Sequence, residues 1–392
     1  MKWQRVPIGL HVSDVQMWQP TIEAPNDDIT YIDIASVDRE SKIISNPSRV
    51  IGSQAPSRAR QLVKGGDVLV STVRPNLNAV ALVSESLSGS TSSTGFSVLR
   101  AKPDSLDHRY LFRWVSNPLF VDQMVKLATG AAYPAVSDAI LKSSTIPLPP
   151  LAEQQRIAAI LDHADALRAK RRAAIAKLDS LSQSIFFDMF RDQNAENSVV
   201  SLAEVTDYQT GYAFSSLEYV PINANAVRLC RGANVLPGRI DWNDTVWWPK
   251  ENIGTLGQFA LCENDVVIAM DRPWISEGFK VAKISSSDLP SLLVQRVTRL
   301  RQTKRALSSF LYFLVRSPAF SRHCKPTETT VPHISPLDIK SFRFSLPTIG
   351  HQNKFDKRIQ CINRQSLAQK KAELLIDQMF ASLQHRAFQG EL

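Results

Sequence analysis

The sequence predicts an α+β fold. Two similar β-rich α/β globules are separated by two long helices that pack as an antiparallel coiled coil, with a pseudo-twofold internal repeat. Two observations lead to this prediction. The chain of 392 residues matches itself at a spacing of 198 residues. Each copy also joins a globular part to a long amphipathic stretch that contains no glycine and no proline.

The internal repeat is visible in three separate blocks that share one offset. DVLVSTVRP, from Asp67, aligns with DVVIAMDRP, from Asp265. Leu148-Pro149 aligns with Leu346-Pro347, and LDSLSQSIFFDMF aligns with IDQMFASLQHRAF. One offset that serves all three blocks indicates the duplication of a unit of roughly 190 residues, and a doubled unit usually meets a doubled target.

Each globular part is predicted to contain short strands and one short helix. Residues 67–73 and 79–84 favour strands, as do residues 265–270 and 278–284, because they are apolar and bounded by turn residues. A short helix is expected at 110–120 and again at 310–320. A polar loop that ends in a proline follows in both copies, with Pro134 matching Pro332.

Each amphipathic stretch is predicted to be one long helix. The first runs from about residue 151 to 190, with apolar residues at three- and four-residue steps, and the second from about 352 to 388. Forty helical residues would span about 60 Å. A lone amphipathic rod cannot bury its apolar stripe, so the two rods are expected to pair. Since a globule connects them, an antiparallel pair is the simplest arrangement.

Composition limits the classes of protein that fit. Net charge is +9 and the pI is about 9.4, which suits a polyanionic partner. The four cysteines lie far apart and form no C-x-x-C pair, which argues against zinc and a disulfide framework. No apolar run is long enough to cross a membrane, and the start lacks the apolar core of a signal peptide, so we expect a cytoplasmic protein.

Two motifs resemble a known family. IPLPPLAEQQRIAAILDHADALRAKRRAAIAKLDSLSQSIFFDMF is similar to the central helical region of specificity subunits of type I restriction–modification systems, and LIDQMFASLQHRAFQGEL is similar to their closing region. The resemblance covers essentially the whole chain. It implies target-recognition domains at 1–150 and 193–347, a central helical spacer at 151–192 and a C-terminal helical spacer at 348–392.

The resemblance also implies a function. The chain would be a non-catalytic DNA-recognition subunit in which each domain reads one half of a split, asymmetric site in double-stranded DNA. The helices would set the unread spacer and dock two modification subunits, and two restriction subunits could then join. S-adenosylmethionine, ATP and Mg would be used by these partners and not by this chain. One departure is that Glu153 has no acidic counterpart, because His351 stands at the matching position.

Catalytic signatures are missing from the sequence. An adenine methyltransferase needs an Asp/Asn-Pro-Pro-aromatic loop, and the nearest candidate, from Asn46 to Arg49, lacks the second proline and the aromatic residue. There is no phosphate-binding loop, and the seven histidines show no spacing typical of metal ligands. We therefore expect no catalytic residues and no metal ligands.

DNA contacts are expected in the loops after the strands, because arginine can bind guanine bidentately or clamp a phosphate. An alternative is that each Arg-Pro is a structural corner whose guanidinium pairs with a carboxylate, and that Trp274 covers the core. The predicted DNA-binding residues are Arg74, Asn76, Asn78, Thr129, Tyr133, Arg272, Trp274, Lys325, Thr327 and Thr329.

Docking of the modification subunits is assigned to the helices. The residues chosen there are Gln154, Ile157, Leu161, Leu178, Ile185, Ile359, Leu374 and Leu383. The basic helix face of Arg168, Lys170, Arg171 and Arg172 has two interpretations, either against spacer DNA or as a solvated surface.

Two other functions stay open at the level of sequence. The chain could be a scaffold of two globules and a coiled coil that binds peptides or membranes and no DNA. A methyltransferase fused to its own recognition domains is disfavoured by the missing catalytic loop. A steep loss of binding at higher salt would distinguish DNA recognition from the scaffold.

Overall fold

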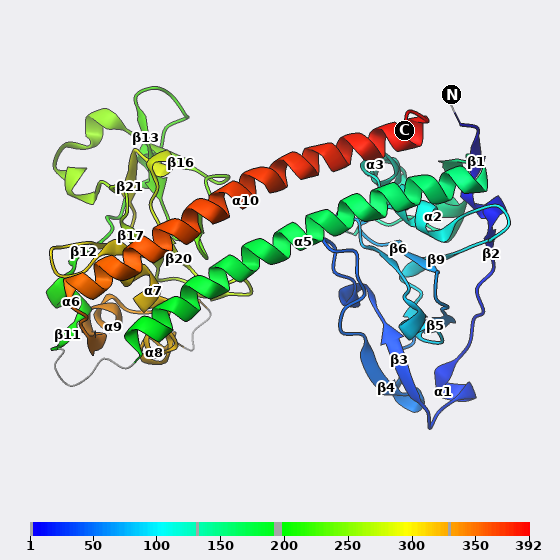
Figure 1. Cartoon of the computed structure of the whole chain (residues 1–392), viewed down its shortest axis with the longest axis horizontal. Coiled ribbons are helices and arrows are strands. Elements are labelled where there is room, and N and C mark those ends of the chain that lie inside the picture. The colour runs from blue at the N-terminus through cyan, green and yellow to red at the C-terminus, as the bar shows by residue number, and fades with distance from the viewer. Residues whose placement is uncertain (1–2, 131–132, 192–197, 328–330) are drawn as a thin grey trace. The chain divides into compact units, whose positions relative to one another are not determined.

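The computed structural model describes residues 3–130, 133–191, 198–327 and 331–392 (Figure 1). It divides into two compact units. Unit 1 comprises Met1–Ala174 with Gln369–Leu392, and unit 2 comprises Ile175–Ala368. Each unit therefore contains one globule and a part of each long helix, α5 (Leu151–Phe190) and α10 (Ile349–Gln389).

The globule of unit 1 is built from small antiparallel and mixed sheets. Its strands are β1 (Arg5–Pro7), β2 (Val12–Ser13), β3 (Asp28–Ile32), β4 (Ser48–Ile51), β5 (Ala59–Leu62), β6 (Val68–Ser71), β7 (Val80–Leu82), β8 (Thr91–Ser93), β9 (Phe96–Ala101) and β10 (Thr145–Pro147). They form the sheets β2-β9-β6-β7, β4-β3-β8-β5 and β1-β10. The helices are α1 (Pro20–Glu23), α2 (His108–Val115), α3 (Pro118–Leu127) and α4 (Asp138–Ser143).

Unit 2 repeats this plan with changes. Its strands are β11 (Val199–Ser201), β12 (Asp207–Thr210), β13 (Ala226–Cys230), β14 (Val235–Leu236), β15 (Arg239–Ile240), β16 (Val246–Pro249), β17 (Val266–Ala269), β18 (Trp274–Ile275), β19 (Gly278–Phe279), β20 (Val281–Lys283), β21 (Ser291–Leu293), β22 (Val297–Arg301) and β23 (Arg343–Ser345). They form the sheets β12-β22-β17-β20, β16-β13-β21, β11-β23, β14-β15 and β18-β19. The helices are α6 (Leu202–Val205), α7 (Ser308–Val315), α8 (Pro318–His323) and α9 (Pro336–Ser341).

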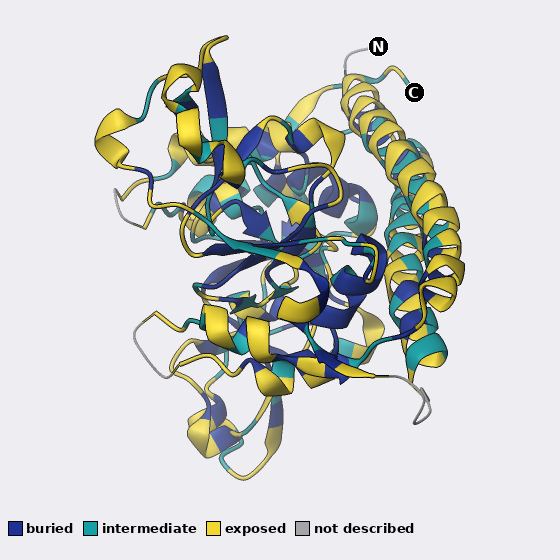
Figure 2. Cartoon of the chain, turned by 90° about the vertical axis from the view of Figure 1, so that its left-hand side faces the viewer, coloured by how far each residue is buried: buried dark blue, intermediate teal, exposed yellow. Residues whose placement is uncertain are grey.

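The core of each unit includes residues of both long helices. In unit 1 the ring of Phe388 from α10 lies 5.0 Å from that of Trp114 in α2, and Ile157 of α5 belongs to the same cluster. In unit 2 Phe186 of α5 lies 5.5 Å from Phe355 of α10 and 5.8 Å from Phe310 of α7. Buried strand residues and exposed outer helix faces are evident in Figure 2. The long helices are therefore part of both hydrophobic cores.

The ion pairs between the helices in unit 1 give their direction. Arg168 of α5 pairs with Asp377 of α10, and Arg172 pairs with Glu373. Residue numbers rise along α5 while they fall along α10, so the helices run antiparallel there. The predicted α+β fold with two long helices is confirmed.

The aspartate that begins the repeated motif has the same structural role in both units. Asp67 and Asp265 are each 1% exposed, and each accepts two hydrogen bonds from an arginine of the neighbouring strand. Arg100 binds Asp67 at 2.8 and 2.7 Å, and Arg301 binds Asp265 at 2.7 and 2.8 Å. A buried carboxylate needs such a paired, hydrogen-bonded partner, so the motif's first residue is structural in both units.

A buried glutamine near the start of each long helix is also equivalent in the two units. The amide oxygen of Gln154 accepts from the backbone N–H of Asp107 at 2.9 Å, and its amide nitrogen donates to the carbonyls of Ser105 and Pro149. Gln352 makes the same three bonds, with the N–H of Leu307 and the carbonyls of Arg305 and Pro347. Gln154 thus joins α5 to the segment before α2, and Gln352 joins α10 to the segment before α7.

The prediction of one short helix at 110–120 and at 310–320 was wrong. Two helices occupy each of these segments, α2 and α3 in unit 1 and α7 and α8 in unit 2, because a capping residue and a proline interrupt the segment. Asn117 accepts from the N–H of Leu119 at 2.8 Å, and Ser317 accepts from the N–H of Phe320 at 3.2 Å. Asn or Ser before proline is a helix N-cap signal, so a new helix begins at each proline.

We expect Gln154→Ala to lower the free energy of unfolding of unit 1 by about 2–5 kcal/mol, because three backbone groups, two of them in buried hydrogen bonds, lose their partner. Urea unfolding followed by circular dichroism measures this. Gln155→Ala, at the exposed neighbouring position, is the matched control and should change little. Equal, small effects of both substitutions would contradict this role of Gln154.

Candidate nucleic-acid interface

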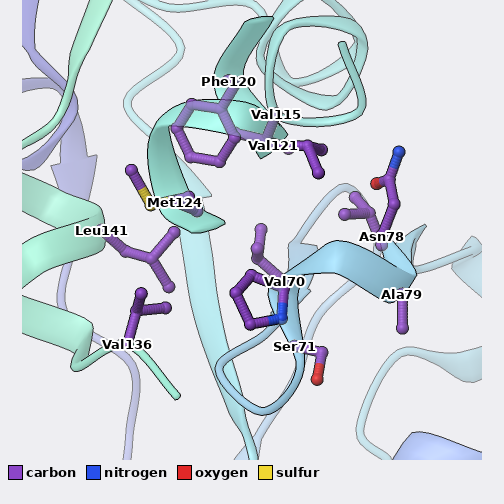
Figure 3. Close-up of a pocket in the computed structure, with 12 residues that line it drawn as sticks. Val70, Ser71, Asn78, Ala79, Val115, Phe120, Val121, Met124, Val136 and Leu141 are labelled. Atoms are coloured by element: carbon purple, nitrogen blue, oxygen red, sulfur yellow. The ribbon is translucent and has the colours of Figure 1, made fainter. Parts of the chain in front are cut away.

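The Arg-Pro turn after β6 divides its residues between the core and the solvent. Pro75 is buried, whereas Arg74 and Asn76 on either side are exposed. Pro75 and Asn78 line a small apolar cavity of about 10 Å³ together with residues of α2, α3 and α4. Figure 3 shows Asn78 among the side chains around it. A cavity of that size holds at most one water molecule, so it is no ligand site. The packing of the buried Pro75 beside it anchors the turn.

The polar loop before α4 lies directly beside this turn. The backbone N–H of Arg74 donates to the carbonyl of Pro134 at 2.7 Å, and that of Val136 donates to Thr72 at 2.9 Å. Thr129 and Ala135 exchange two backbone hydrogen bonds of 3.0 and 2.9 Å, which close the loop. The structure therefore brings together the two loops that the sequence analysis chose separately. We call this pair of loops the recognition edge of unit 1, residues 72–78 and 129–136 as far as they are described.

Unit 2 has the same arrangement. The N–H of Arg272 donates to the carbonyl of Pro332 at 2.7 Å, and that of Ile334 donates to Met270 at 3.0 Å. Thr327 donates its backbone N–H to His333 at 2.9 Å and its hydroxyl lies 2.9 Å from the ring Nδ1 of the same residue. The recognition edge of unit 2 comprises residues 270–274 and 325–334 as far as they are described. Both edges follow the 198-residue offset.

Two of the predicted DNA-binding residues interact directly in unit 1. The guanidinium carbon of Arg74 lies 4.9 Å from the ring centre of Tyr133, which is 68% exposed. A cation above an aromatic face gains favourable electrostatic energy. Both side chains therefore lie at the surface of the same edge.

The carboxylate alternative for the Arg-Pro turns is not favoured. Within the described residues, neither Arg74 nor Arg272 forms an ion pair with a carboxylate, and both side chains are exposed. Carboxylates close to the turns pair elsewhere, as Asp271 does with Arg296 at 3.7 Å. The guanidinium groups thus remain available to a ligand.

Asn78 and Trp274 take part in the structure of their own units. The side-chain amide nitrogen of Asn78 donates to the carbonyl of Ser116 at 3.0 Å, and the backbone carbonyl of Asn78 accepts from the Lys42 ammonium. Trp274 stacks on Phe279 at 4.7 Å and packs against the core of unit 2. These contacts give both residues a structural role beside the DNA contact predicted for them.

The remaining predicted contact residues lie in the second loop of unit 2. Lys325 and Thr327 are exposed. Thr329 lies outside the described residues.

Two lysines near these edges were not identified from the sequence. Burial lowers the pKa of Lys42 to about 8, while Asp38 and Asp165 act in the opposite direction. Burial also lowers the pKa of Lys280, which lies next to Arg272 and whose ammonium is 3.4 Å from the carbonyl of Asp271. No local sequence signal marks either one, since Lys42 comes from a distant loop and Lys280 from a predicted strand.

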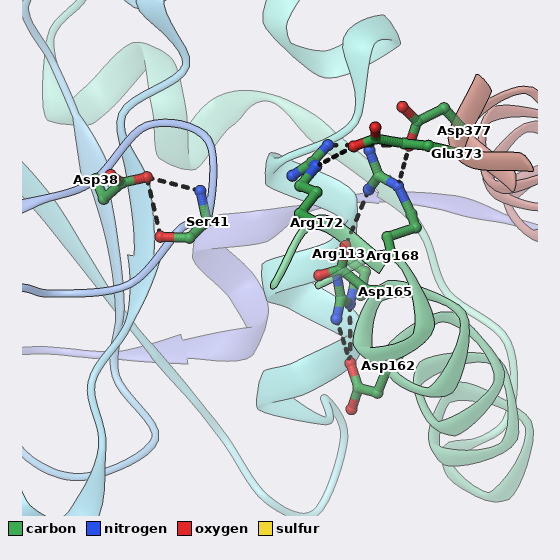
Figure 4. A network of polar contacts seen from close by, with 9 residues as sticks. All are labelled: Asp38, Ser41, Arg113, Asp162, Asp165, Arg168, Arg172, Glu373 and Asp377. Carbon is green, nitrogen blue, oxygen red and sulfur yellow. Dashed lines mark hydrogen bonds and ion pairs between the residues drawn. The ribbon is translucent and has the colours of Figure 1, made fainter. Parts of the chain in front are cut away.

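The basic face of α5 is used within unit 1 (Figure 4). Arg168 bonds Asp377 at 2.6 Å and Asp165 at 2.9 Å, and Arg172 approaches Glu373 at 3.3 Å. Arg171 bonds the amide of Gln369. These contacts support neither a DNA-facing nor a purely solvated interpretation, because the arginines join α5 to α10.

The predicted docking residues fall into two groups. Gln154, Ile157, Leu161 and Ile359 are at most 3% exposed, and their side chains contact the chain's own cores. Leu374 is 65% exposed, whereas Leu178, Ile185 and Leu383 are partly buried. Leu375 and Met379, which were not chosen from the sequence, are 61% and 63% exposed beside Leu374 on α10. A partner could contact only this second, accessible kind of residue directly.

Among the described residues, no group of three or more His, Cys, Asp or Glu side chains is placed to hold a metal ion. No helix among them is long and apolar enough to cross a membrane.

Comparisons with known proteins find similar sequences for part of the chain. The family described as the type I restriction modification DNA specificity domain matches residues 23–177. The EcoAI type I restriction enzyme specificity subunit of Escherichia coli is 36% identical over 169 residues, which cover 42% of this chain and 28% of that subunit. The MjaVIII specificity subunit of Methanocaldococcus jannaschii is 27% identical over 283 residues, which cover 68% of this chain and 65% of that subunit. The matches thus span less than two thirds of these relatives.

Solved structures support the same fold. A chain from a study of complex assembly and conformational transition of the type I R-M system has a TM-score of 0.62 at 24% identity, covering 100% of this chain and 98% of that one. The S subunit of a type I system from M. genitalium has a TM-score of 0.54 at 14% identity, covering 98% and 96%.

Residues 23–177 thus resemble a type I restriction–modification DNA specificity domain. The chain's predicted resemblance to the specificity subunits of these systems is confirmed, and the scaffold alternative is not favoured.

The lowered pKa of Lys42 predicts how the free energy of unfolding changes with pH. The unfolded chain binds more protons at this residue between its folded pKa of about 8 and the usual value of 10.5. Stability contributed by this residue therefore rises with pH across that window. We expect the unfolding free energy of the natural chain, relative to Lys42→Met, to be larger at pH 10 than at pH 7.5 in urea titrations. A pH-independent difference would contradict the burial of the ammonium.

Proposed function

We propose that this chain is the sequence-specific DNA-recognition subunit of a type I restriction–modification complex. Each unit reads one half of a bipartite, asymmetric site in double-stranded DNA. The observation that carries this proposal is the recognition edge itself. The same two loops, with three equivalent backbone hydrogen bonds and an exposed arginine, occur once in each unit. The match to the DNA specificity domain supports it.

In this proposal the predicted contact residues lie on the two recognition edges. Residues 1–150 and 193–347 are the target-recognition domains, and residues 151–192 and 348–392 are the helical spacers. The long helices set the unread gap and dock two modification subunits, and two restriction subunits can join the complex. The chain acts in the cytoplasm and has no catalytic activity and no cofactor of its own. Methylation and cleavage, with S-adenosylmethionine, ATP and Mg, belong to the partners.

A methylation map tests the proposal. The chain is co-expressed with its modification subunit in a bacterial host that lacks other DNA methylation, and the genome is sequenced for N6-methyladenine. We expect one split motif with a fixed unread gap, because two separate units read the two halves. The modification subunit expressed alone is the control. An assembled complex that methylates no defined motif would refute the proposed function.

The exposed apolar residues of α10 provide a test of docking. Leu374, Leu375 and Met379 leave apolar surface uncovered on one helix, and such a patch suits a protein partner. We expect Met379→Glu to reduce co-purification of the modification subunit at least about tenfold, because a charge would be buried in the contact. Thermal unfolding of the free chain should stay unchanged.

Gln378→Glu is the matched control, since it adds the same charge at the exposed adjacent position. Docking on this face is contradicted if Met379→Glu co-purifies with its partner as well as Gln378→Glu does.

A further inference from the structure

The arginines of the two Arg-Pro turns have a backbone conformation that arginine rarely adopts. φ is +50° at Arg74 and +44° at Arg272, in the left-handed region. A Cβ makes this region unfavourable, and glycine or asparagine occupies it more readily. The following proline restricts the backbone further. Local backbone preference therefore disfavours arginine at both positions.

Arginine nevertheless occupies both equivalent positions. Since the backbone conformation disfavours it there, we attribute its presence to its side chain. Strained positive-φ residues that are held by their surroundings often lie at functional sites. Here the surroundings are the second loop of each edge, whose proline carbonyl accepts the arginine N–H at 2.7 Å in both units. The backbone is thus fixed in the same way twice, and each side chain starts from a fixed position.

The guanidinium groups are suited to a planar ligand. Both are exposed, and within the described residues neither forms an ion pair with a carboxylate. The Arg74 guanidinium lies over the Tyr133 ring. The N–H donors of a guanidinium lie in its plane, so packing of its face against a ring leaves them available at its edge.

In unit 2 the 198-residue offset places Val331 where unit 1 has Tyr133. Beside Arg272 lies the buried Lys280 instead. The two arginines therefore share a backbone position but have different side-chain neighbours.

We infer that Arg74 and Arg272 each read one guanine, one in each half of the DNA site. In both, two parallel N–H donors bind O6 and N7 in the major groove. The inference rests on the proposed function and adds the base and the residue to it. A bidentate fork matches guanine, whereas a phosphate contact needs only a positive charge.

Glycine substitutions test the inference without removing the turn. Glycine adopts positive φ freely, so Arg74→Gly and Arg272→Gly should unfold within about 3 °C of the natural chain. Methylation maps are then recorded for the natural complex and for each variant. We expect Arg74→Gly to lose selectivity at one guanine of one half-site and leave the other half unchanged. Arg272→Gly should do the same in the other half.

A base analogue tests the contact itself. Duplexes that carry the mapped site are made with 7-deazaguanine, which lacks N7, at the guanine that Arg74→Gly ceases to select. Fluorescence anisotropy with the complex should show about 10- to 100-fold weaker binding of this duplex by the natural chain. The Arg74→Gly complex should bind both duplexes equally. Arg74→Lys should behave like Arg74→Gly, because lysine keeps the charge but not the fork.

The possible results distinguish a failure of the proposed function from a failure of the guanine inference alone. A natural complex without any defined motif would overturn the proposed function and the inference with it. A natural complex with a split motif that Arg74→Gly and Arg272→Gly leave unchanged would overturn the inference alone. Weaker binding with an unchanged motif, rescued by Arg74→Lys, would also overturn it and would assign Arg74 to a phosphate.

Discussion

The attachment of each long helix to a globule depends on one fully hydrogen-bonded, buried amide. Gln154 and Gln352 each satisfy one backbone N–H and two backbone carbonyls. These groups meet where the last strand of the globule, the start of α2 or α7 and the long helix come together. A buried amide with three partners permits little rotation or sliding. Within each unit the helix is therefore a rigid continuation of the globule, and the aromatic core that includes Phe388 or Phe186 forms around this junction.

The two residues of each Arg-Pro turn have different roles. Proline goes into the core and arginine goes into the solvent, although the backbone conformation required of the arginine is unfavourable. The buried Asp67 and Asp265, each held by an arginine, stabilise the strand that leads into the turn. Apolar packing and buried ion pairs thus stabilise a frame, and the frame holds a strained residue at its edge. In this way a folded protein can hold a residue in a backbone conformation that the isolated segment would avoid.

Much of this fold could be predicted because a duplicated sequence must form the same backbone twice. The 198-residue offset relates Gln154 to Gln352 and Pro134 to Pro332, and the structure gives each pair the same hydrogen bonds. Long helices are predictable because their periodicity is local. The break before Pro118 was missed even though Asn117 is a strong N-cap signal. The pairing of Arg168 with Asp377 and the contact of Lys42 with Asn78 join residues far apart in sequence, so no local pattern could reveal them.

The differences between the two units are as informative as their common frame. After the shared turn, unit 1 continues with a 3-10 helix at Pro75–Leu77, whereas unit 2 continues with the hairpin β18-β19. Tyr133 stands beside Arg74, and Lys280 lies beside Arg272. The residues that hold the turn are the same in both units, whereas the side chains around the two arginines differ. A shared frame with different surroundings at each exposed arginine is suited to two related but unequal targets, which is what an asymmetric, bipartite DNA site requires.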